Sequence, residues 1–299
     1  MSLGSPRPAA VDFCGLSLAG PIINGSGTFD AIAALRVFGD GLLEAFPFDA
    51  YVSKTITLAP RQGNRPPRLW EAGAGLINSI GLPNKGLEGY LRDDLPILTR
   101  LPVPLITNVM GHSHAEIGEL VSTVGSYDQV AAIEINVSCP NVDSGLVMGA
   151  DPTETAALVS HVRGLTNKPL IIKLTPNATD VAAVALAAQE AGADAVSLIN
   201  TLRAMALHPK TSEPWLGGKT GGLSGPAVRS IALAQVYEVA QRISIPIVGI
   251  GGVQSGDDAL NLLKAGATVV AVGTESFRDP TAGSRIGAEL AAISRKERE

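Results

Sequence analysis

Eight short apolar runs recur along the 299-residue chain, and each is followed by polar or glycine-rich residues and then by a segment of helical character. Short runs that are rich in β-branched residues and bounded by turn residues are typical of buried strands. We expect strands within residues 21–25, 50–55, 104–110, 131–137, 169–175, 195–201, 245–250 and 268–273. Strands that alternate with helices form parallel sheets, because each helix carries the chain back to the edge where the next strand begins.

Helix-capping signals between the runs support this alternation. Asp151 precedes Pro152 and Glu154, which is the order of an N-cap, a first-turn proline and a capping glutamate. Ser255 is a second candidate N-cap, and an alanine-rich helix is expected to end at Gly192. Eight such units in a chain of this length predict an α/β fold of the (β/α)8 TIM-barrel type. A doubly wound open sheet is the alternative, although an open sheet rarely needs eight strands at this spacing.

Two segments, residues 56–85 and 202–225, are too long to be plain connections. We expect both inserted loops to lie over the C-terminal ends of the strands, where barrels have their active sites. No strong internal repeat or low-complexity segment marks a boundary between domains. The sequence therefore predicts an N-terminal tail at residues 1–10 and a single barrel domain over residues 11–299.

Composition argues against several other classes of protein. Hydrophobic residues make up 45% of the chain and charged residues 17%, a balance that disordered chains do not have. The net charge of −5 argues against a general nucleic-acid binder, which usually carries a basic surplus. No stretch of 18 residues is continuously apolar, and the first residues lack the apolar centre of a signal peptide. We therefore expect no membrane span and no secretion signal.

Two cysteines, Cys14 and Cys139, are too few for a disulfide framework, a four-thiolate zinc site or an iron–sulfur cluster. We expect no metal site, and a cytoplasmic protein with reduced thiols. A lone cysteine is usually a buried, inert thiol, and this role suits Cys14, which precedes the first strand. Cys139 follows the fourth strand and precedes Pro140, so it starts a loop from which a thiol can act as a base.

Polar residues stand at the C-terminal ends of six of the eight expected strands. Because these ends meet at one mouth of a barrel, their side chains are costly to desolvate unless a polar ligand satisfies them. A single asparagine at a strand end is usually a turn former, but the convergence of six such ends favours a ligand site. The residues are Ser26, Lys54, Thr55, Asn108, Asn136, Ser138, Cys139, Lys173, Asn200 and Thr201.

Glycine-containing segments follow the last two strands, at residues 249–253 (GIGGV) and 272–274 (VGT). Barrels commonly bind phosphate there, because glycine lets backbone N–H groups approach the oxygens and a helix N-terminus faces the anion. A phosphate site, a polar mouth and two lysines suit FMN, whose ring would cap the barrel. Lys173 would then stabilise negative charge near ring N1 on reduction. A non-catalytic phosphate-binding barrel is the alternative from a different functional class.

The chain resembles the dihydroorotate dehydrogenases, flavin enzymes of pyrimidine synthesis that oxidise dihydroorotate to orotate. The matching motifs are NGSGTF at 24–29, VSKT at 52–55, PRQGN at 60–64, NSIGLPN at 78–84, NVSCPNV at 136–142, KLTPN at 173–177, NTL at 200–202, GGLSGP at 221–226 and GIGGV at 249–253. They occur in order within a similarity that runs from about residue 11 to residue 280. The resemblance implies that the barrel domain binds FMN.

Carried over to matching positions, the resemblance implies a role for each site residue. Cys139 would be the catalytic base, taking a proton from carbon 5 of dihydroorotate while carbon 6 passes hydride to the flavin. FMN would be held by Ser26, Lys54, Thr55, Asn108, Asn136, Lys173, Ile199, Gly225, Gly251, Gly252, Gly273 and Thr274. Dihydroorotate and orotate would be held by Lys54, Asn78, Ser79, Ile80, Gly81, Leu82, Asn136, Asn200 and Thr201.

The stretch SCPNVDSGLVMGADP at residues 138–152 is similar to the class 1, B type of this family. The resemblance implies a homodimer of this chain that joins an electron-transfer subunit, with FAD and a [2Fe–2S] cluster, in a heterotetramer that reduces NAD. The A type, a homodimer that uses fumarate, is the alternative, as is a related FMN barrel that acts on another dihydropyrimidine. Membrane-associated members carry an N-terminal extension and a serine base, and we expect neither here.

Overall fold

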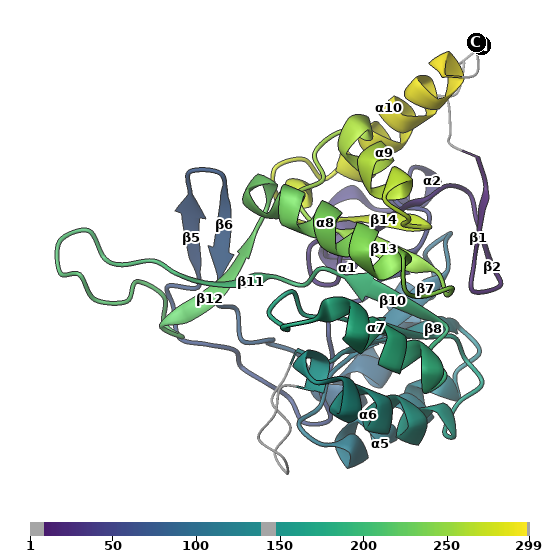
Figure 1. Cartoon of the computed structure of the whole chain (residues 1–299), viewed down its shortest axis with the longest axis horizontal. Coiled ribbons are helices and arrows are strands. Elements are labelled where there is room, and N and C mark those ends of the chain that lie inside the picture. Colours follow the sequence, from purple (N-terminus) through teal and green to yellow (C-terminus); the bar gives the residue numbers. More distant parts are fainter. Residues whose placement is uncertain (1–8, 139–147, 298–299) are drawn as a thin grey trace.

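The computed structural model describes residues 9–138 and 148–297. Eight parallel strands form one sheet in the order β3-β14-β13-β10-β9-β8-β7-β4 (Figure 1). Their bounds are β3 Ile22–Asn24, β4 Tyr51–Val52, β7 Leu105–Val109, β8 Val130–Asn136, β9 Leu170–Lys173, β10 Ala195–Leu198, β13 Ile247–Ile250 and β14 Val269–Val272. Each of the eight expected runs supplies one strand, and the prediction of a (β/α)8 barrel is confirmed.

Helices cover the outside of the sheet between successive strands (Figure 1). The α-helices are α1 Ala31–Phe38, α2 Gly41–Glu44, α3 Gly86–Gly89, α4 Leu95–Leu98, α5 His114–Gly125, α6 Pro152–Arg163, α7 Val181–Glu190, α8 Arg229–Ala240, α9 Gly256–Lys264 and α10 Ala282–Lys296. Shorter turns are the π-helix η1 Tyr90–Asp94 and the 3₁₀ helices η2 Met148–Ala150, η3 Pro226–Val228 and η4 Thr274–Phe277.

Two of the helix starts expected from sequence are capped as predicted. The Asp151 side chain accepts a hydrogen bond of 2.9 Å from the backbone N–H of Glu154. At α9, Ser255 and Asp258 form a reciprocal capping box, in which each side chain accepts from the backbone N–H of the other residue. Such caps satisfy donors that a helix start leaves without partners. None of the described helices is long and apolar enough to cross a membrane.

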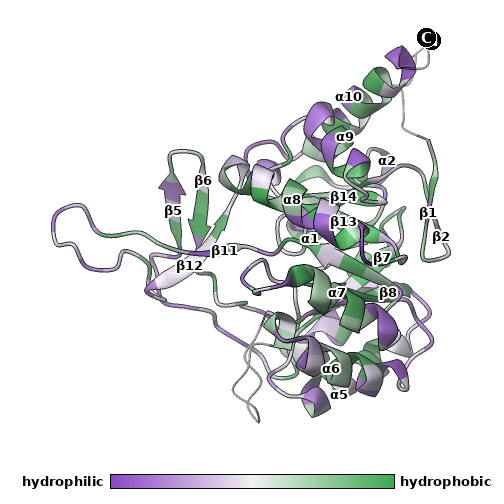
Figure 2. Ribbon diagram, in the orientation of Figure 1, coloured by the Kyte–Doolittle hydropathy of each residue, from purple (hydrophilic) through white to green (hydrophobic). Residues whose placement is uncertain are grey.

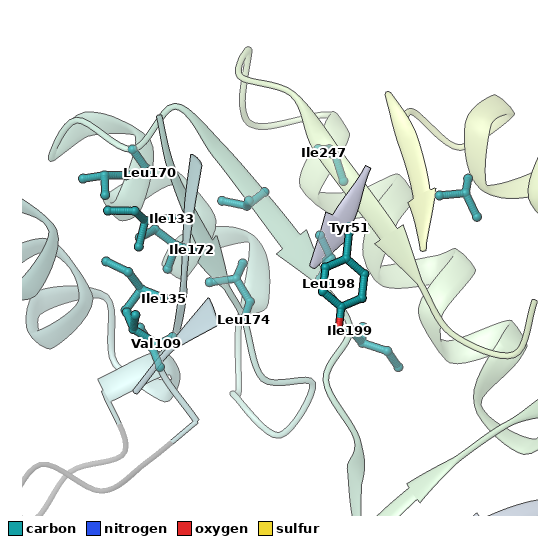
Figure 3. Close-up of a cluster of buried hydrophobic side chains, with 14 of the residues drawn as sticks. Tyr51, Val109, Ile133, Ile135, Leu170, Ile172, Leu174, Leu198, Ile199 and Ile247 are labelled. Atoms are coloured by element: carbon teal, nitrogen blue, oxygen red, sulfur yellow. The ribbon is translucent and has the colours of Figure 1, made fainter. Parts of the chain in front are cut away.

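Apolar side chains fill both faces of the barrel sheet, because the two faces pack against different partners. Alternate residues of β8 and β9, such as Ile133, Ile135 and Ile172, point outward into the layer beneath the helices (Figure 3). The residues between them point inward; Ala132 and Ile171 are apolar, whereas Glu134 is polar. β14, whose residues are all apolar, is green in Figure 2. This burial on both sides explains why the strands read as continuous apolar runs rather than as alternating ones.

The bottom of the barrel is closed by the hairpin of β1 Val11–Phe13 and β2 Leu16–Leu18. Phe13 and Leu18 are at most 1% exposed and pack against inward-facing residues near the strand starts, including Ile106 and Ile171. The interior is thus dry at this end, so a polar ligand has access only from the opposite end.

Asn24 closes the barrel where the strand order ends, between β3 and β4. Its side-chain amide donates to the Val52 carbonyl and accepts from the Val52 N–H, both at 2.8 Å. The side chain therefore supplies the two hydrogen bonds that a neighbouring strand would otherwise make. Asn24 is fully buried, and Val52 is 2% exposed.

We expect Asn24→Ala to lower the free energy of unfolding by about 2–4 kcal/mol, because each unsatisfied buried polar group costs about 1–3 kcal/mol. Urea denaturation followed by circular dichroism measures the change. The matched control is Asn167→Ala at an exposed position, which should stay within about 0.5 kcal/mol of wild type. An Asn24→Ala protein as stable as the control would show that the backbone closes the barrel without this side chain.

The two long inserted segments pair with each other in a second, four-stranded antiparallel sheet. Its strands are β5 Leu69–Ala72, β6 Gly75–Asn78, β11 Leu202–Met205 and β12 Thr220–Ser224, in the order β11-β12-β6-β5. Figure 1 shows this sheet projecting to one side of the barrel. Ile77 and Leu216 form a small core of its own. The segments expected as loops therefore contain regular strands.

Candidate active site

A cavity of about 320 Å³ lies between the C-terminal ends of the barrel strands and the four-stranded sheet. This volume is in the range of sites for small ligands and cofactors. Most of the residues predicted from sequence line it: Ser26, Lys54, Thr55, Asn78, Ile80, Leu82, Asn136, Lys173, Ile199, Asn200, Thr201, Gly225, Gly251, Gly252, Gly273 and Thr274. Residues at the ends of separate strands therefore line one cavity, as expected.

Three predicted residues do not reach the cavity wall. Ser79 lies between Asn78 and Ile80, and its hydroxyl instead accepts a hydrogen bond of 2.9 Å from the Asn64 side chain. Gly81 has φ +74°, and a Cβ there would meet the Asn64 backbone N at 2.5 Å, so close packing accounts for this glycine. Asn108 is fully buried inside the barrel. Their predicted ligand contacts stay predictions.

Cys139, the predicted base, lies outside the described residues. The residue before it, Ser138, belongs to a polar group at the cavity wall. The Asn200 amide donates to Ser138 Oγ at 2.9 Å and to Asn136 Oδ1 at 3.3 Å. The Asn200 Oδ1 atom accepts from the Thr201 N–H at 2.8 Å. These bonds fix the orientation of the amides on two neighbouring segments.

Lys54 and Lys173 bring positive charge to the cavity. Lys173, the last residue of β9, is only 8% exposed, and Asn136 and Ser197 lie beside it in the sheet. Partial burial lowers the pKa of Lys54, and nearby Asp30 opposes this effect. Within residues 9–138 and 148–297, neither ammonium group has a carboxylate within 4.0 Å. The two charges are thus available to an anionic ligand.

Gly225, Gly251 and Gly252 form a cradle of backbone at one end of the cavity. Their φ angles are +85°, +145° and +71°, a region that favours glycine. A Cβ on Gly251 would lie 2.4 Å from the Ala232 Cβ, and one on Gly252 would lie 2.9 Å from the Gly225 carbonyl oxygen. Only glycines fit here. Bare backbone next to the start of α8 can bring N–H groups close to an anion such as phosphate.

Glu134, which we did not single out from sequence, lies in a polar layer beneath the cavity. It is 3% exposed and accepts hydrogen bonds from the Asn108 amide at 2.5 Å and the Ser197 hydroxyl at 2.8 Å. The Oδ1 atom of Asn108 has no hydrogen-bond partner among the described residues. A signal for Glu134 was present, because a charged residue in the middle of an apolar strand run faces inward with Asn136.

A sequence model of the dihydroorotate dehydrogenase family matches residues 9–293. The chain belongs to the dihydroorotate dehydrogenase family. This makes it an oxidoreductase of that family and confirms the resemblance seen in its motifs. Two relatives, from Geotalea daltonii and Desulforudis audaxviator, are each 44% identical over 282 and 285 residues, respectively. In both cases the match covers 94% of this chain and 91% of the relative, and each relative is named dihydroorotate dehydrogenase B (NAD(+)), catalytic subunit.

A solved structure of dihydroorotate dehydrogenase from Eimeria tenella, in complex with ferulenol, has the same fold. It superposes with a TM-score of 0.80 at 22% sequence identity, and the match covers 99% of this chain and 87% of the other. At this identity the likeness supports the barrel architecture.

We expect Glu134→Leu to destabilise the barrel more than Glu134→Gln. Leucine leaves the Asn108 amide and the Ser197 hydroxyl without their acceptor, at about 1–3 kcal/mol for each buried donor. Glutamine keeps one acceptor, and Asn108 can turn its free Oδ1 toward the new amide, so the loss should stay near about 1 kcal/mol. Urea denaturation ranks the variants.

The control is Glu119→Leu, which makes the same substitution at an exposed position of α5. Equal stability of Glu134→Leu and this control would contradict a structural role for the polar layer.

Proposed function

We propose that this chain is the FMN-binding catalytic subunit of a class 1, B-type dihydroorotate dehydrogenase. It oxidises (S)-dihydroorotate to orotate in de novo pyrimidine (UMP) biosynthesis. The proposal rests on one cavity in a member of this family. The cavity combines a glycine cradle, three asparagine amides and two lysines that have no carboxylate partner in the described part of the chain. The names of the relatives, which are 42–44% identical, support the B type.

The residues at the cavity fit FMN. The cradle at Gly225, Gly251 and Gly252, where a Cβ would collide with neighbours, suits a phosphate bound by backbone N–H groups. Ile199 and Leu223 add apolar surface for a planar ring, and the buried Lys173 lines the same cavity. When bound, FMN supplies the acceptor for the hydride of the substrate. Asn108, whose buried Oδ1 has no partner among the described residues, stays a predicted contact of FMN.

The remaining polar residues suit a flat pyrimidine that carries a carboxylate. Asn78, Asn136 and Asn200 can each donate and accept hydrogen bonds along the edge of such a ring. Lys54, at the cavity mouth, can neutralise the carboxylate as a point charge. A neutral dihydropyrimidine has no group to pair with Lys54, so the charge favours dihydroorotate over such substrates.

Cys139 takes the proton from the substrate in this proposal. A free thiol has a pKa of about 8.5, and neighbouring cations lower it toward neutrality. Ser138, hydrogen-bonded to Asn200, anchors the chain immediately before the cysteine.

Anaerobic addition of dihydroorotate should bleach the visible flavin absorbance of the purified protein, and mass spectrometry of the heat-released cofactor should find FMN. In stopped-flow experiments, Cys139→Ala should slow this reduction by about 10²–10⁴-fold, the usual effect of losing a positioned base. Cofactor content should be unchanged, and Cys139→Ser should also be slow, since a hydroxyl is the weaker base. The wild-type rate should rise with pH as the thiol ionises.

Stoichiometric FAD would contradict the cofactor proposal. Reduction of the alanine variant within a few-fold of wild type would show that Cys139 is not the base.

The chain alone should reduce NAD weakly, and an added iron–sulfur flavoprotein subunit should restore NADH formation. Its two cysteines cannot hold a cluster, so a partner must carry the electrons. An artificial dye should accept electrons from the chain alone and serves as the control for an intact site. Rapid NAD reduction by the single chain would contradict the B type, and rapid fumarate reduction would favour the A type. The homodimer, the heterotetramer and the cytoplasmic location belong to the same proposal.

A further inference from the structure

We propose that Arg229 is a positioning residue for the cofactor phosphate: it holds the Gly251–Gly252 loop in its anion-binding shape without contacting the anion. This inference rests on the proposed binding of FMN. Arg229 is the first residue of α8 and is not among the described residues that line the cavity. Gly252, which it contacts, does line the cavity.

Arg229 contacts the loop through hydrogen bonds and through packing. Its Nε donates to the Gly252 carbonyl at 2.9 Å, and its guanidinium also donates to the Gln254 side chain at 2.9 Å. A Cβ on Gly252 would lie 2.8 Å from the Arg229 Cβ, so the loop backbone rests directly on this side chain. Because the Gly252 carbonyl is held on the arginine side, the left-handed conformation of Gly252 is fixed.

The same network joins this loop to the segment that follows β14. The Gln254 side chain donates to Glu275 at 2.9 Å. Arg285 donates to the Gln254 carbonyl at 2.9 Å and to Glu275 at 3.2 Å. Glu275 follows Thr274, which lines the cavity near the cradle, since a Cβ on Gly225 would lie 3.5 Å from the Thr274 Cγ2 atom. Hydrogen bonds among residues that do not line the cavity therefore connect the two glycine-containing segments.

Carboxylates neutralise both arginines, which argues that they act through geometry rather than through charge. Arg229 lies 3.1 Å from Asp258, and Arg285 pairs with Glu275, Asp279 and Glu289 at 2.9–3.2 Å. An anion in the cradle therefore meets backbone N–H groups and a helix start, not a surplus of guanidinium charge.

A comparison of FMN with riboflavin tests this role, because riboflavin has the same ring and lacks the phosphate. Apoprotein is titrated with each flavin, and quenching of flavin fluorescence gives the Kd. For Arg229→Met we expect the FMN Kd to rise on the order of tenfold, the loss typical of one charge-assisted hydrogen bond. The riboflavin Kd should stay within about twofold of wild type, since the ring contacts are untouched.

Two further variants keep the test interpretable. Arg229→Lys can reach only part of the network and should lie between Arg229→Met and wild type for FMN. Arg242→Met is the matched control, since Arg242 pairs with the exposed Asp180 at 3.1 Å and contacts neither glycine segment. It should leave both Kd values unchanged.

An equal loss of FMN and riboflavin binding in both Arg229 variants would overturn the inference, because it would indicate general damage to the pocket. Unchanged FMN binding in Arg229→Met would overturn it as well. Wild-type apoprotein that binds neither flavin would overturn the proposed function and this inference with it, whereas an intact wild type with insensitive variants would overturn the inference alone.

Discussion

The closure of the barrel by Asn24 is the interaction on which the geometry of the cavity depends. A barrel must satisfy the hydrogen-bonding groups of its first and last strands, and here one side-chain amide does so for Val52. Ser26 lies two residues beyond Asn24, and its hydroxyl donates to the Ser53 carbonyl at 2.8 Å. The closure therefore brings Ser26 next to Lys54, so that two segments separated in sequence form one wall of the cavity.

Strand alternation then orders the interior into layers. Ala132, Glu134 and Asn136 all point inward from β8, because side chains of a strand reach the same face at every second residue. Ala132 belongs to the apolar floor, Glu134 to the hydrogen-bonded layer above it and Asn136 to the cavity wall. Burial of the Glu134 carboxylate is tolerated because two donors satisfy it. Polarity thus rises from the sealed end of the barrel to the open end.

The strands and most of the cavity wall could be predicted from sequence because both depend on local patterns. Apolar runs mark buried strands, and the residue after each run must stand at the barrel mouth. The four-stranded sheet could not be predicted in this way, since Asn78 contacts Gly222 across 144 residues of sequence. That long-range pairing decides whether the Ser79 side chain faces the cavity or Asn64. A motif that covers residues 78–82 as one stretch does not show which of these two orientations Ser79 takes.

The cations around the cavity divide into two groups with different physical tasks. Arg229 and Arg285 are neutralised by carboxylates and therefore shape backbone. Lys54 and Lys173 have no carboxylate within ion-pair distance in the described part of the chain, and a partly desolvated ammonium group is unfavourable until an anion arrives. The lowered pKa of Lys54 reflects the cost of desolvating its ammonium group. A bound carboxylate would raise this pKa again, because it favours the charged form. In the proposed complex, the positive charge of the two lysines would therefore favour an anionic ligand, and the glycine backbone would fix its position.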